Sequence, residues 1–298
     1  MQGQIMHILK YWKLESEDVK QIYTSAWLVG EQYVLKVYDD CVALERNIKI
    51  LKALAENDIP VAKVISTKEG TSYVEEKGVF FVLTARLPGS NLVQFDKEFS
   101  IATQMGWIIG DLHAAFRTCE KEIEFWDNSL LDELKGWIRA AFEKNNWEYV
   151  SKEGFEALVK GLEALYDNLP RHLIHRDVHF GNFLFDKGNF SGYIDFDLSQ
   201  RNIRIFDLCY FLLGLLSEEE KLELTKAQWF EIVEKTLAGY EQISPLNEAE
   251  KKAIPLVMEA IELLFVAWFT ENDNVHCAKD ALQLYEFVKE HEEVLCVI

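Results

Sequence analysis

The order of apolar and polar positions divides the chain into a strand-rich beginning and a helix-rich remainder. Residues 18–38, "DVKQIYTSAWLVGEQYVLKVY", alternate apolar and polar side chains, which is typical of strands with one buried face, and Gly30 predicts a turn between two arms. Apolar residues then recur at helical spacing over 41–59, and Pro60 ends that predicted helix. Strand patterns return over 60–89. The beginning of the chain therefore predicts a small sheet with one main helix.

The rest of the chain mostly follows the spacing of amphipathic helices. The clearest example is "IATQMGWIIGDLHAAF", residues 101–116. Further helical patterns cover 129–145, 151–168, 226–240, 248–270 and 277–293. A strand-like island at 173–199 interrupts them, and Gly188 and Asn189 predict a turn between its two short strands.

These elements predict an α+β protein with two lobes, separated near the hinge dipeptide Pro88-Gly89. The N-terminal lobe, 1–86, contains a small antiparallel sheet with its one main helix. The C-terminal lobe, 87–298, is larger and mostly helical, and it holds the 173–199 hairpin. We find no repeat, low-complexity tract or long linker.

The charge balance is acidic. The 298 residues include 31 Lys and Arg against 50 Asp and Glu, which gives a net charge of −19. A field of that sign disfavours contact with nucleic acid and with anionic membranes, so we expect neither as a partner. Two interpretations of the charge stay open, solubility alone or attraction of a cationic substrate. We expect a monomer or a homodimer.

The five cysteines are odd in number and form no C-x-x-C pair, which argues against a disulfide or zinc framework. The N-terminus has neither the apolar core nor the small-residue cleavage site of a signal peptide. The longest apolar run, "LCYFLLGLL" at 208–216, is too short to span a bilayer. We therefore expect a cytoplasmic protein.

Polar residues crowd into the otherwise apolar stretch "LIHRDVHFGNFLF", residues 173–185. Asp177 and Asn182 flank a predicted tight loop, and Asp195 follows the second strand of the hairpin. Two carboxylates and an amide oxygen form a set of hard oxygen ligands, which suits Mg²⁺. A structural alternative is that Asp177 and Asn182 cap backbone groups in a turn.

The spacing of these residues also fits a known catalytic loop. His175-Arg176-Asp177-x4-Asn182 follows the kinase pattern H-R-D-L-x-x-x-N, with valine in place of leucine. Asp195 lies in "IDFD", a segment that is similar to the metal-binding D-F-G of kinases. These two matches favour catalysis over a purely structural turn.

Two further kinase features occur upstream, in the expected order. Lys36 lies in the alternating strand "YVLKVY" and resembles the lysine of V-A-I-K. Glu45 follows nine residues later on the predicted helix, where a glutamate that pairs with the lysine is expected.

The combined motifs resemble the aminoglycoside phosphotransferase and choline kinase superfamily, which has a protein kinase-like fold. The resemblance covers roughly 20–215, fades in the final third, and is specific for fold and reaction but not for substrate. Its members have a histidine-x-aspartate-x4-asparagine loop, a strand that ends in I-D-F/W, an R-x-x-D-L helix start and an L-x-x-L-H helix. The corresponding segments here are His175/Asp177/Asn182, Ile194-Asp195-Phe196, Arg204/Asp207-Leu208 and "GDLHAAF" at 110–116.

This resemblance implies roles for the loop residues in phosphoryl transfer, in which positioning and charge neutralisation provide most of the catalysis. Asp177 orients the acceptor hydroxyl and takes its proton, and His175 braces the loop. Asn182 and Asp195 hold Mg²⁺ against the phosphates of ATP or GTP.

The resemblance also implies a nucleotide site in the N-terminal lobe. Lys36 steadies the phosphates and is fixed by Glu45. The chain lacks the G-x-G-x-x-G run of protein kinases, so Thr24 and Ser25, at the tip of the predicted hairpin, are the candidates for phosphate contacts. Adenine is expected at the segment "LTARLPG", which contains Ala85, through backbone groups.

The acceptor is expected to bind in the C-terminal lobe. The candidate acceptor contacts are Asp197, His179, Glu262, Trp268 and Glu271. Acidic and aromatic residues there suit an amine, although a solvated acidic face with a core aromatic stripe gives the same pattern. We therefore expect a phosphotransferase that acts on a hydroxyl of a small, amine-bearing molecule.

Alternatives remain open at this point. The acceptor can instead be choline or ethanolamine, homoserine, a sugar, or a serine or threonine of a protein. A non-catalytic nucleotide-binding scaffold is a different class of function, but the intact set of Lys36, Asp177, Asn182 and Asp195 argues against it.

Overall fold

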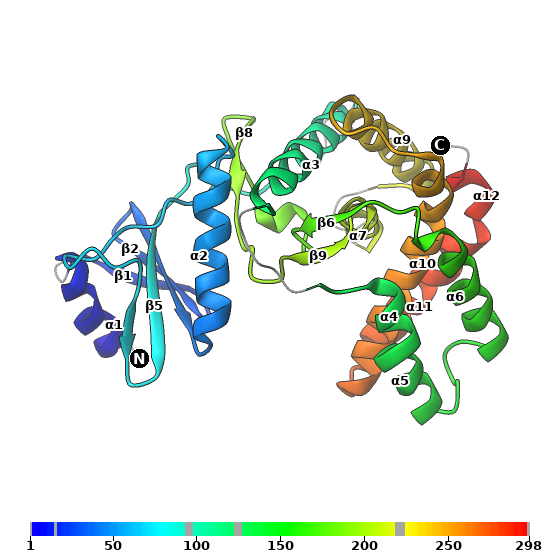
Figure 1. The fold of residues 1–298 in the computed structure, drawn as a ribbon, viewed down its shortest axis with the longest axis horizontal. Helices are drawn as coiled ribbons and strands as arrows, with labels where there is room; N and C mark the ends of the chain where they lie inside the picture. Colours follow the sequence, from blue (N-terminus) through cyan, green and yellow to red (C-terminus); the bar gives the residue numbers. More distant parts are fainter. Residues whose placement is uncertain (1, 15–16, 93–97, 122–126, 218–223, 297–298) are drawn as a thin grey trace. The chain divides into compact units, whose positions relative to one another are not determined.

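The computed structural model describes residues 2–14, 17–92, 98–121, 127–217 and 224–296. The chain forms two compact units (Figure 1). The first unit consists of Met1–Leu92 and Gly181–Asp197, and the second of Val93–Phe180 and Leu198–Ile298. The sequence-based division at 86/87 thus differs from the observed one. The main difference is that most of the predicted hairpin belongs to the first unit.

The first unit is built on an antiparallel sheet of five strands in the order β1-β2-β3-β5-β4. Its elements are α1 (Gln2–Ile8), η1 (Leu9–Trp12), β1 (Val19–Tyr23), β2 (Ala26–Val29), β3 (Tyr33–Tyr38), α2 (Cys41–Glu56), β4 (Val74–Glu76) and β5 (Val79–Ala85). Thr24-Ser25 connects β1 to β2, and the predicted turn at Gly30 connects β2 to β3. The predicted α+β class, with a small sheet and one main helix, is confirmed, whereas α1 was not anticipated.

The alternation along β3 explains how the sheet buries both faces. Leu35 lies on the face covered by α1 and η1, in a core with Trp27 and Phe81. Lys36 and Tyr38 point to the opposite face because successive side chains of a strand alternate. There, Tyr38 packs with Leu44 and other residues of α2. Lys36 is therefore placed on the face that α2 covers (Figure 1).

The hairpin of β7 (Phe183–Asp186) and β8 (Asn189–Tyr193) joins this unit through backbone hydrogen bonds. The Ser90 and Phe185 backbones exchange two bonds of 3.0 and 2.8 Å, and the Tyr193 amide donates to the Pro60 carbonyl at 2.9 Å. Gly89 has φ +96°, and a Cβ there would collide with the backbone of Phe185. These bonds explain why 181–197 groups with the N-terminal sheet.

The second unit is mostly helical. Its helices are α3 (Ser100–Cys119), α4 (Leu130–Glu133), η2 (Leu134–Ile138), α5 (Arg139–Lys144), α6 (Lys152–Tyr166), α7 (Ile205–Ser217), α9 (Lys226–Ile243), α10 (Glu248–Glu271), α11 (Val275–Glu290) and α12 (Glu292–Leu295). The short η3 (Phe180–Asn182) spans the boundary between the units. Two short strands, β6 (Arg171–Ile174) and β9 (Gln200–Ile203), pair antiparallel in a separate sheet. The sequence pattern predicted only two strands in this region and missed the pairing of β6 with β9.

Two glycines allow α3 and α9 to pack closely. A Cβ at Gly106 would collide with the carbonyl of Thr236, and one at Gly239 with the carbonyl of Thr103. Such close backbone approach needs glycine, which has no side chain to separate the helices. The contact fixes how α9 lies against α3.

The long helix α10 begins with a capping box, in which Asn247 accepts from the Glu250 amide and Glu250 accepts from the Asn247 amide. Within the described parts of the chain, it is the one helix long and apolar enough to cross a membrane, and 67% of its most apolar window is buried inside the fold. Helices α6, α7 and α11 pack against it. That packing is the arrangement of a core helix.

Candidate active site

In the first unit, Lys36 forms the centre of a charged cluster. Its Nζ lies 2.8 Å from Oδ1 of Asp195 and also pairs with Oδ2 of Asp197. Burial opposes the charged form of the lysine, but the two carboxylates outweigh it and raise the pKa of Lys36. The lysine is therefore held charged, beside the two aspartates of "IDFD".

Asp197 has a second set of partners on its other oxygen. Oδ1 accepts from the Tyr38 hydroxyl at 2.8 Å and from the Asn47 side-chain amide at 2.5 Å. Both donors are buried. Asp197 was predicted to contact an acceptor amine; in the structure its oxygens bond Lys36, Tyr38 and Asn47, and the acceptor contact stays a prediction.

The predicted pair between Lys36 and Glu45 is not the pair that the structure forms. Glu45 is exposed, and its carboxylate accepts from the Tyr73 hydroxyl at 3.1 Å. The cause is helical periodicity, since Asn47, three residues after Leu44, lies on the buried face of α2. Asn47, rather than Glu45, reaches the charged cluster.

Asn182 and Asp195 are adjacent because the Ile194 amide donates to the Asn182 carbonyl at 3.0 Å. Asn182 is buried, whereas the Asp195 side chain is 47% exposed and its backbone has φ +65°. A left-handed non-glycine residue is strained, and such strain tends to occur at functional sites.

The donor types fit the magnesium implied by the resemblance. An amide side chain and a partly exposed carboxylate provide oxygen ligands, and Mg²⁺ is commonly bound by one or two protein ligands together with phosphates and water. The described residues contain no group of three or more His, Cys, Asp or Glu that would hold a metal without such help. Asn182 and Asp195 are therefore the residues that would hold it.

The other nucleotide candidates lie on the same unit. Thr24 and Ser25 are exposed at the β1–β2 turn, where the Ser25 carbonyl accepts from the Val37 amide at 2.8 Å. Ala85 ends β5, and its amide donates to the Lys63 carbonyl at 2.8 Å. The Ala85 N–H is thus occupied within the fold.

In the second unit, Asp177 is oriented by a hydroxyl. The Tyr210 hydroxyl donates to its Oδ1 at 2.8 Å, and Nε2 of His179 lies 3.5 Å from its Oδ2. The Asp177 amide donates to Nδ1 of His175, at 3.3 Å. Burial favours the protonated acid, but His179 and Tyr210 outweigh it and lower the pKa of Asp177 to about 2. The carboxylate is held ionised.

The loop that carries Asp177 is fastened by the buried carboxylate of Asp207. Its Oδ2 accepts from the His175 amide and its Oδ1 from the Arg176 amide, both at 2.8 Å. Nε2 of His113 also lies 3.0 Å from Oδ2. Burial raises the pKa of Asp207, while these donors oppose the rise. Through these contacts Asp207, at the start of α7, ties down the loop.

His113 connects that carboxylate to α9. Burial and the nearby Arg204 lower the pKa of His113 to about 3, so the ring is neutral near pH 7. Since a carboxylate only accepts, Nε2 of the ring donates to Asp207, which leaves Nδ1 to accept from the Tyr240 hydroxyl at 2.8 Å. A buried chain of bonds thus runs from Tyr240 to the catalytic loop.

Arg176 is held in a strained backbone conformation. Its φ is +69°, its guanidinium bonds both carboxylate oxygens of Glu133 at 2.8 and 3.1 Å, and it lies over the ring of Phe206. These contacts add to those of Asp207 in defining the loop.

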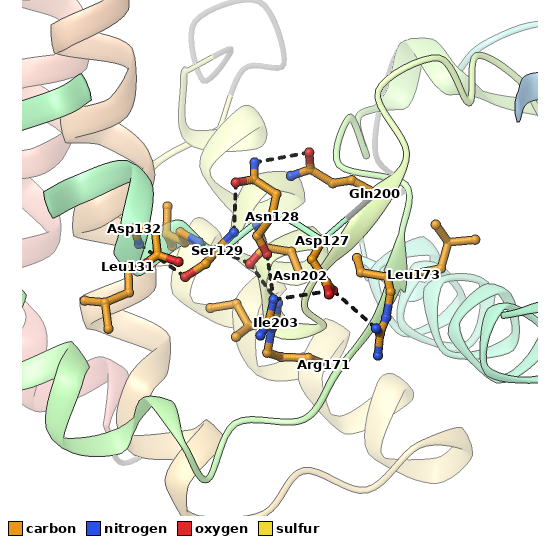
Figure 2. Close-up of polar contacts among 12 residues, drawn as sticks. Asp127, Asn128, Ser129, Leu131, Asp132, Arg171, Leu173, Gln200, Asn202 and Ile203 are labelled. Atoms are coloured by element: carbon orange, nitrogen blue, oxygen red, sulfur yellow. Dashed lines mark hydrogen bonds and ion pairs between the residues drawn. The ribbon is translucent and has the colours of Figure 1, made fainter. Parts of the chain in front are cut away.

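A polar network holds the strand that leads into the loop (Figure 2). Arg171, the first residue of β6, donates to the Asn128 carbonyl at 2.9 Å and lies 3.7 Å from Asp127. Asn128 bonds the Gln200 side chain of β9 at 3.2 Å. Figure 2 shows these residues converging beside Asn202, whose Oδ1 accepts from the Ile203 amide. Since β6 ends at Ile174, the network positions the residue just before His175.

The acceptor candidates on α10 differ in their surroundings. Trp268 is 51% exposed, and Glu271 pairs with Lys144 at 2.9 Å. Glu259 and Glu262 are buried, and burial raises the pKa of Glu262 to about 8. The predicted alternative of a solvated acidic face therefore does not describe the two buried glutamates.

Glu262 lies near the residue that orients Asp177. Phe265, one turn further along α10, has its ring centroid 6.0 Å from that of Tyr210. Burial and the neighbouring Asp177 raise the pKa of Tyr210, and Glu262 adds to this effect. Tyr210 therefore contacts both Asp177 and Phe265, and Glu262 lies one turn before Phe265 on α10.

Sequence reasoning missed three residues that these contacts involve: Tyr38, Asn47 and Tyr210. Two had a readable signal. Tyr38 follows Lys36 by two residues and so shares its strand face, and Asn47 is a polar residue on the apolar face of a helix. Tyr210 had no comparable signal in its apolar helix.

A family model described as a phosphotransferase enzyme family matches residues 18–246, which is more than half of the chain. The chain belongs to the phosphotransferase enzyme family. This phosphotransferase is an enzyme of the small-molecule kinase class. Both the family resemblance noted from the sequence and the predicted reaction class are therefore confirmed.

Curated relatives of this phosphotransferase include homoserine kinases. The one from Polaromonas naphthalenivorans is 23% identical over 271 residues, which are 85% of this chain and 78% of the relative. The one from Phenylobacterium zucineum is 34% identical over 98 residues, which are 33% of this chain and only 28% of the relative.

Solved structures show the same fold. An amicoumacin kinase in complex with AMP-PNP, Ca²⁺ and Ami has a TM-score of 0.70 and 17% identity, covering 98% of this chain and 93% of its own. A microcompartment-associated aminopropanol kinase has a TM-score of 0.69 and 16% identity, and the match covers 100% of this chain and 99% of the kinase. At such identities, these likenesses support the fold and not the substrate.

Proposed function

We propose that this phosphotransferase transfers the γ-phosphoryl group of ATP or GTP to a hydroxyl of a small, amine-bearing molecule. The observation that carries the proposal is Asp177, an ionised carboxylate that Tyr210 orients on a loop fastened by Asp207. A carboxylate fixed in this way suits the positioning of an acceptor hydroxyl, because positioning dominates catalysis of phosphoryl transfer.

The reaction balances as follows. The acceptor oxygen forms a bond to the γ-phosphorus, the bond from that phosphorus to the β–γ bridging oxygen breaks, and the nucleoside diphosphate leaves with the electron pair. The hydroxyl proton passes to Asp177. With its pKa lowered to about 2, Asp177 is a weak base, so it accepts the proton late, as the new phosphate ester forms.

The first unit supplies the groups for the nucleotide. Lys36 is a charged donor on the sheet and suits a phosphate, and Thr24 and Ser25 are exposed at a strand turn. Asn182 and Asp195 would hold Mg²⁺, which when bound neutralises charge on the β- and γ-phosphates. The AMP-PNP complex of the amicoumacin kinase supports nucleotide use by this fold.

The buried Glu262 favours an amine on the acceptor. Burial raises the pKa of Glu262 to about 8, so near pH 7 the side chain is mostly protonated in the free protein, and a bound ammonium group would favour its carboxylate form. The ring of Tyr210, whose pKa Glu262 helps to raise, offers an aromatic face to the same cation. The named relatives support this class, since homoserine and aminopropanol each contain a hydroxyl and an amine. His179, 3.5 Å from Asp177, is a further candidate contact.

The test is a panel of acceptors with ATP or GTP and magnesium: homoserine, aminopropanol and an aminoglycoside, each matched with a deaminated analogue. We expect an amine-bearing alcohol to give the higher kcat/KM, and phosphorylated product to be detected by mass spectrometry. Glu262→Gln should remove most of the preference for the amine while leaving turnover of the analogue within about 3-fold. Equal kcat/KM for amine and analogue in the wild type would refute the acceptor class.

Asp177→Asn is the blank for the reaction itself. We expect kcat to fall by about 10³-fold or more, with nucleotide affinity within about 3-fold of the wild type, because Asp177 acts on the acceptor. Asp280→Asn, an exposed aspartate of α11, is the matched control and should leave both quantities unchanged. Full turnover by Asp177→Asn would show that the acceptor base lies elsewhere.

A further inference from the structure

The cluster around Lys36 differs from the kinase pattern in where its carboxylates come from. In the pattern, one carboxylate comes from the helix and pairs with the lysine. In the described cluster, both carboxylates that pair with Lys36 come from the segment after β8, as Asp195 and Asp197, and the helix contributes the neutral Asn47. This exchange of functions suggests a specific role for Asp197.

The two aspartates are held differently. Asp197 is fixed from both sides, because one oxygen pairs with Lys36 while the other accepts from Tyr38 and Asn47. Asp195 is the more exposed of the two, with 47% of its side chain accessible against 31% for Asp197. Tyr38 and Asn47 are uncharged, so they orient Asp197 without replacing Lys36 as its charged partner.

The backbone supports this geometry. Lys36 and Tyr38 share one face of β3, so both reach the same aspartate. Asn47 lies one turn after Leu44 on the face of α2 that packs on that side of the sheet, and Asp40 caps the helix by accepting from the Val42 amide at 2.8 Å. Strand and helix thus present a hydroxyl and an amide to one carboxylate.

We infer that Asp197, oriented by Tyr38 and Asn47, is the positioning residue that anchors Lys36 for the phosphates of the nucleotide, in place of a helix glutamate. The inference rests on the proposed function. If Asp195 binds Mg²⁺ as proposed, it no longer pairs with Lys36. Asp197 is then the one carboxylate of the pair that still does.

The experiment measures magnesium–nucleotide binding by calorimetry with a non-hydrolysable ATP analogue, and kcat and KM with the best acceptor of the panel. Asp197→Asn should lower kcat/KM for the nucleotide by about 30-fold, with the larger part in kcat, because an unanchored lysine aligns the phosphates poorly. Glu56→Gln, an exposed glutamate at the end of α2, is the matched control and should match the wild type.

Rescue separates positioning from general structural damage. Adding Asn47→Glu to Asp197→Asn returns a carboxylate to the cluster from the helix side, and we expect kcat/KM to recover to within about 5-fold of the wild type. Thermal unfolding of each variant reports its fold. If Asp197→Asn does not fold, Tyr38→Phe, which removes only the orienting hydroxyl, should still lower kcat about 3- to 10-fold.

The outcomes are distinct. The anchor role would be overturned if Asp197→Asn kept the wild-type kcat/KM or if the double variant showed no recovery. An equally large loss in Glu45→Gln would also overturn it, because the anchor would then be Glu45. An unaffected kcat in Tyr38→Phe would overturn it where Asp197→Asn fails to fold. A wild-type protein that binds no nucleotide and phosphorylates nothing would instead refute the proposed function.

Discussion

The two groups of catalytic candidates are held in place by different physical means. Around Lys36, partly exposed charges pair with one another, and two aspartates share one lysine. Around Asp177, a fully buried carboxylate at Asp207 and a neutral His113 fasten the loop. Exposed ion pairs are weak and easily exchanged, whereas buried hydrogen-bonded carboxylates are costly to disturb.

This difference indicates a division of labour in the proposed reaction. In the charged cluster of the first unit, the more exposed Asp195 is suited to exchange Lys36 for other partners when a nucleotide binds. The loop of the second unit is built before any substrate arrives, which lowers the cost of orienting an acceptor. Three predictions test this contrast, in order of decreasing effect.

The largest expected effect follows from Asp207→Asn. The asparagine side chain keeps one oxygen that can accept, but its NH₂ group would face the donors that the second oxygen now serves. The amide of Arg176, or the amide of His175 together with His113, would therefore lose its acceptor. We expect the free energy of unfolding to fall by about 2–4 kcal/mol in urea denaturation. Turnover should also fall, with little change in nucleotide affinity. A variant as stable as the wild type would show that the loop is not fastened by this residue.

A smaller effect concerns pH and Glu262. Its pKa is raised from 4.5 to about 8 by burial, so the folded state binds a proton more tightly than the unfolded state. The stabilisation of the folded state by this proton is fully present below pH 4.5 and is lost as the pH rises through 8. Its charge affects Tyr210 on α7, whose pKa it helps to raise.

Glu262→Gln removes the titration. In urea denaturation from pH 5 to 8, we expect the free energy of unfolding of the variant to rise relative to that of the wild type by on the order of 1 kcal/mol per pH unit. Glu290→Gln, on the exposed end of α11, should run parallel to the wild type. A parallel curve for Glu262→Gln as well would mean that Glu262 ionises normally.

The smallest effect is expected for Tyr210→Phe. Loss of the hydroxyl leaves Asp177 ionised but less well oriented, so kcat should fall about 3- to 10-fold. The pKa of Asp177 should rise, which moves the acidic limb of the kcat profile to higher pH. Tyr285→Phe is the control, because that hydroxyl accepts from Lys289, four residues later on α11, and not from the catalytic loop. An unchanged profile would exclude Tyr210 as an orienting donor.

Much of this architecture could be predicted because it depends on local patterns. The alternation around Lys36 and the spacing of Asp177 and Asn182 placed these residues on a strand and a loop, as the structure shows. The pairing of β6 with β9 was missed because it joins segments that the hairpin separates, and short strands without a turn signal give little periodicity.

The partners of the charged groups were harder to predict than the groups themselves. Glu45 was chosen for its charge, yet a shift of two residues along a helix turns a side chain by about 200°. Asn47 therefore reaches the cluster and Glu45 reaches Tyr73. Asp197 was assigned to the acceptor because sequence alone does not show which carboxylate a lysine takes.

The close contact of α3 with α9 has a consequence for how this enzyme can lose activity. His113 lies on α3 and Tyr240 on α9, one residue after Gly239. A methyl group at Gly106 or Gly239 would push the helices apart and misalign that bond, although neither glycine touches a reacting group. A screen for inactive variants should therefore return substitutions at these helix crossings, and such variants would be easily mistaken for mutants of the catalytic centre.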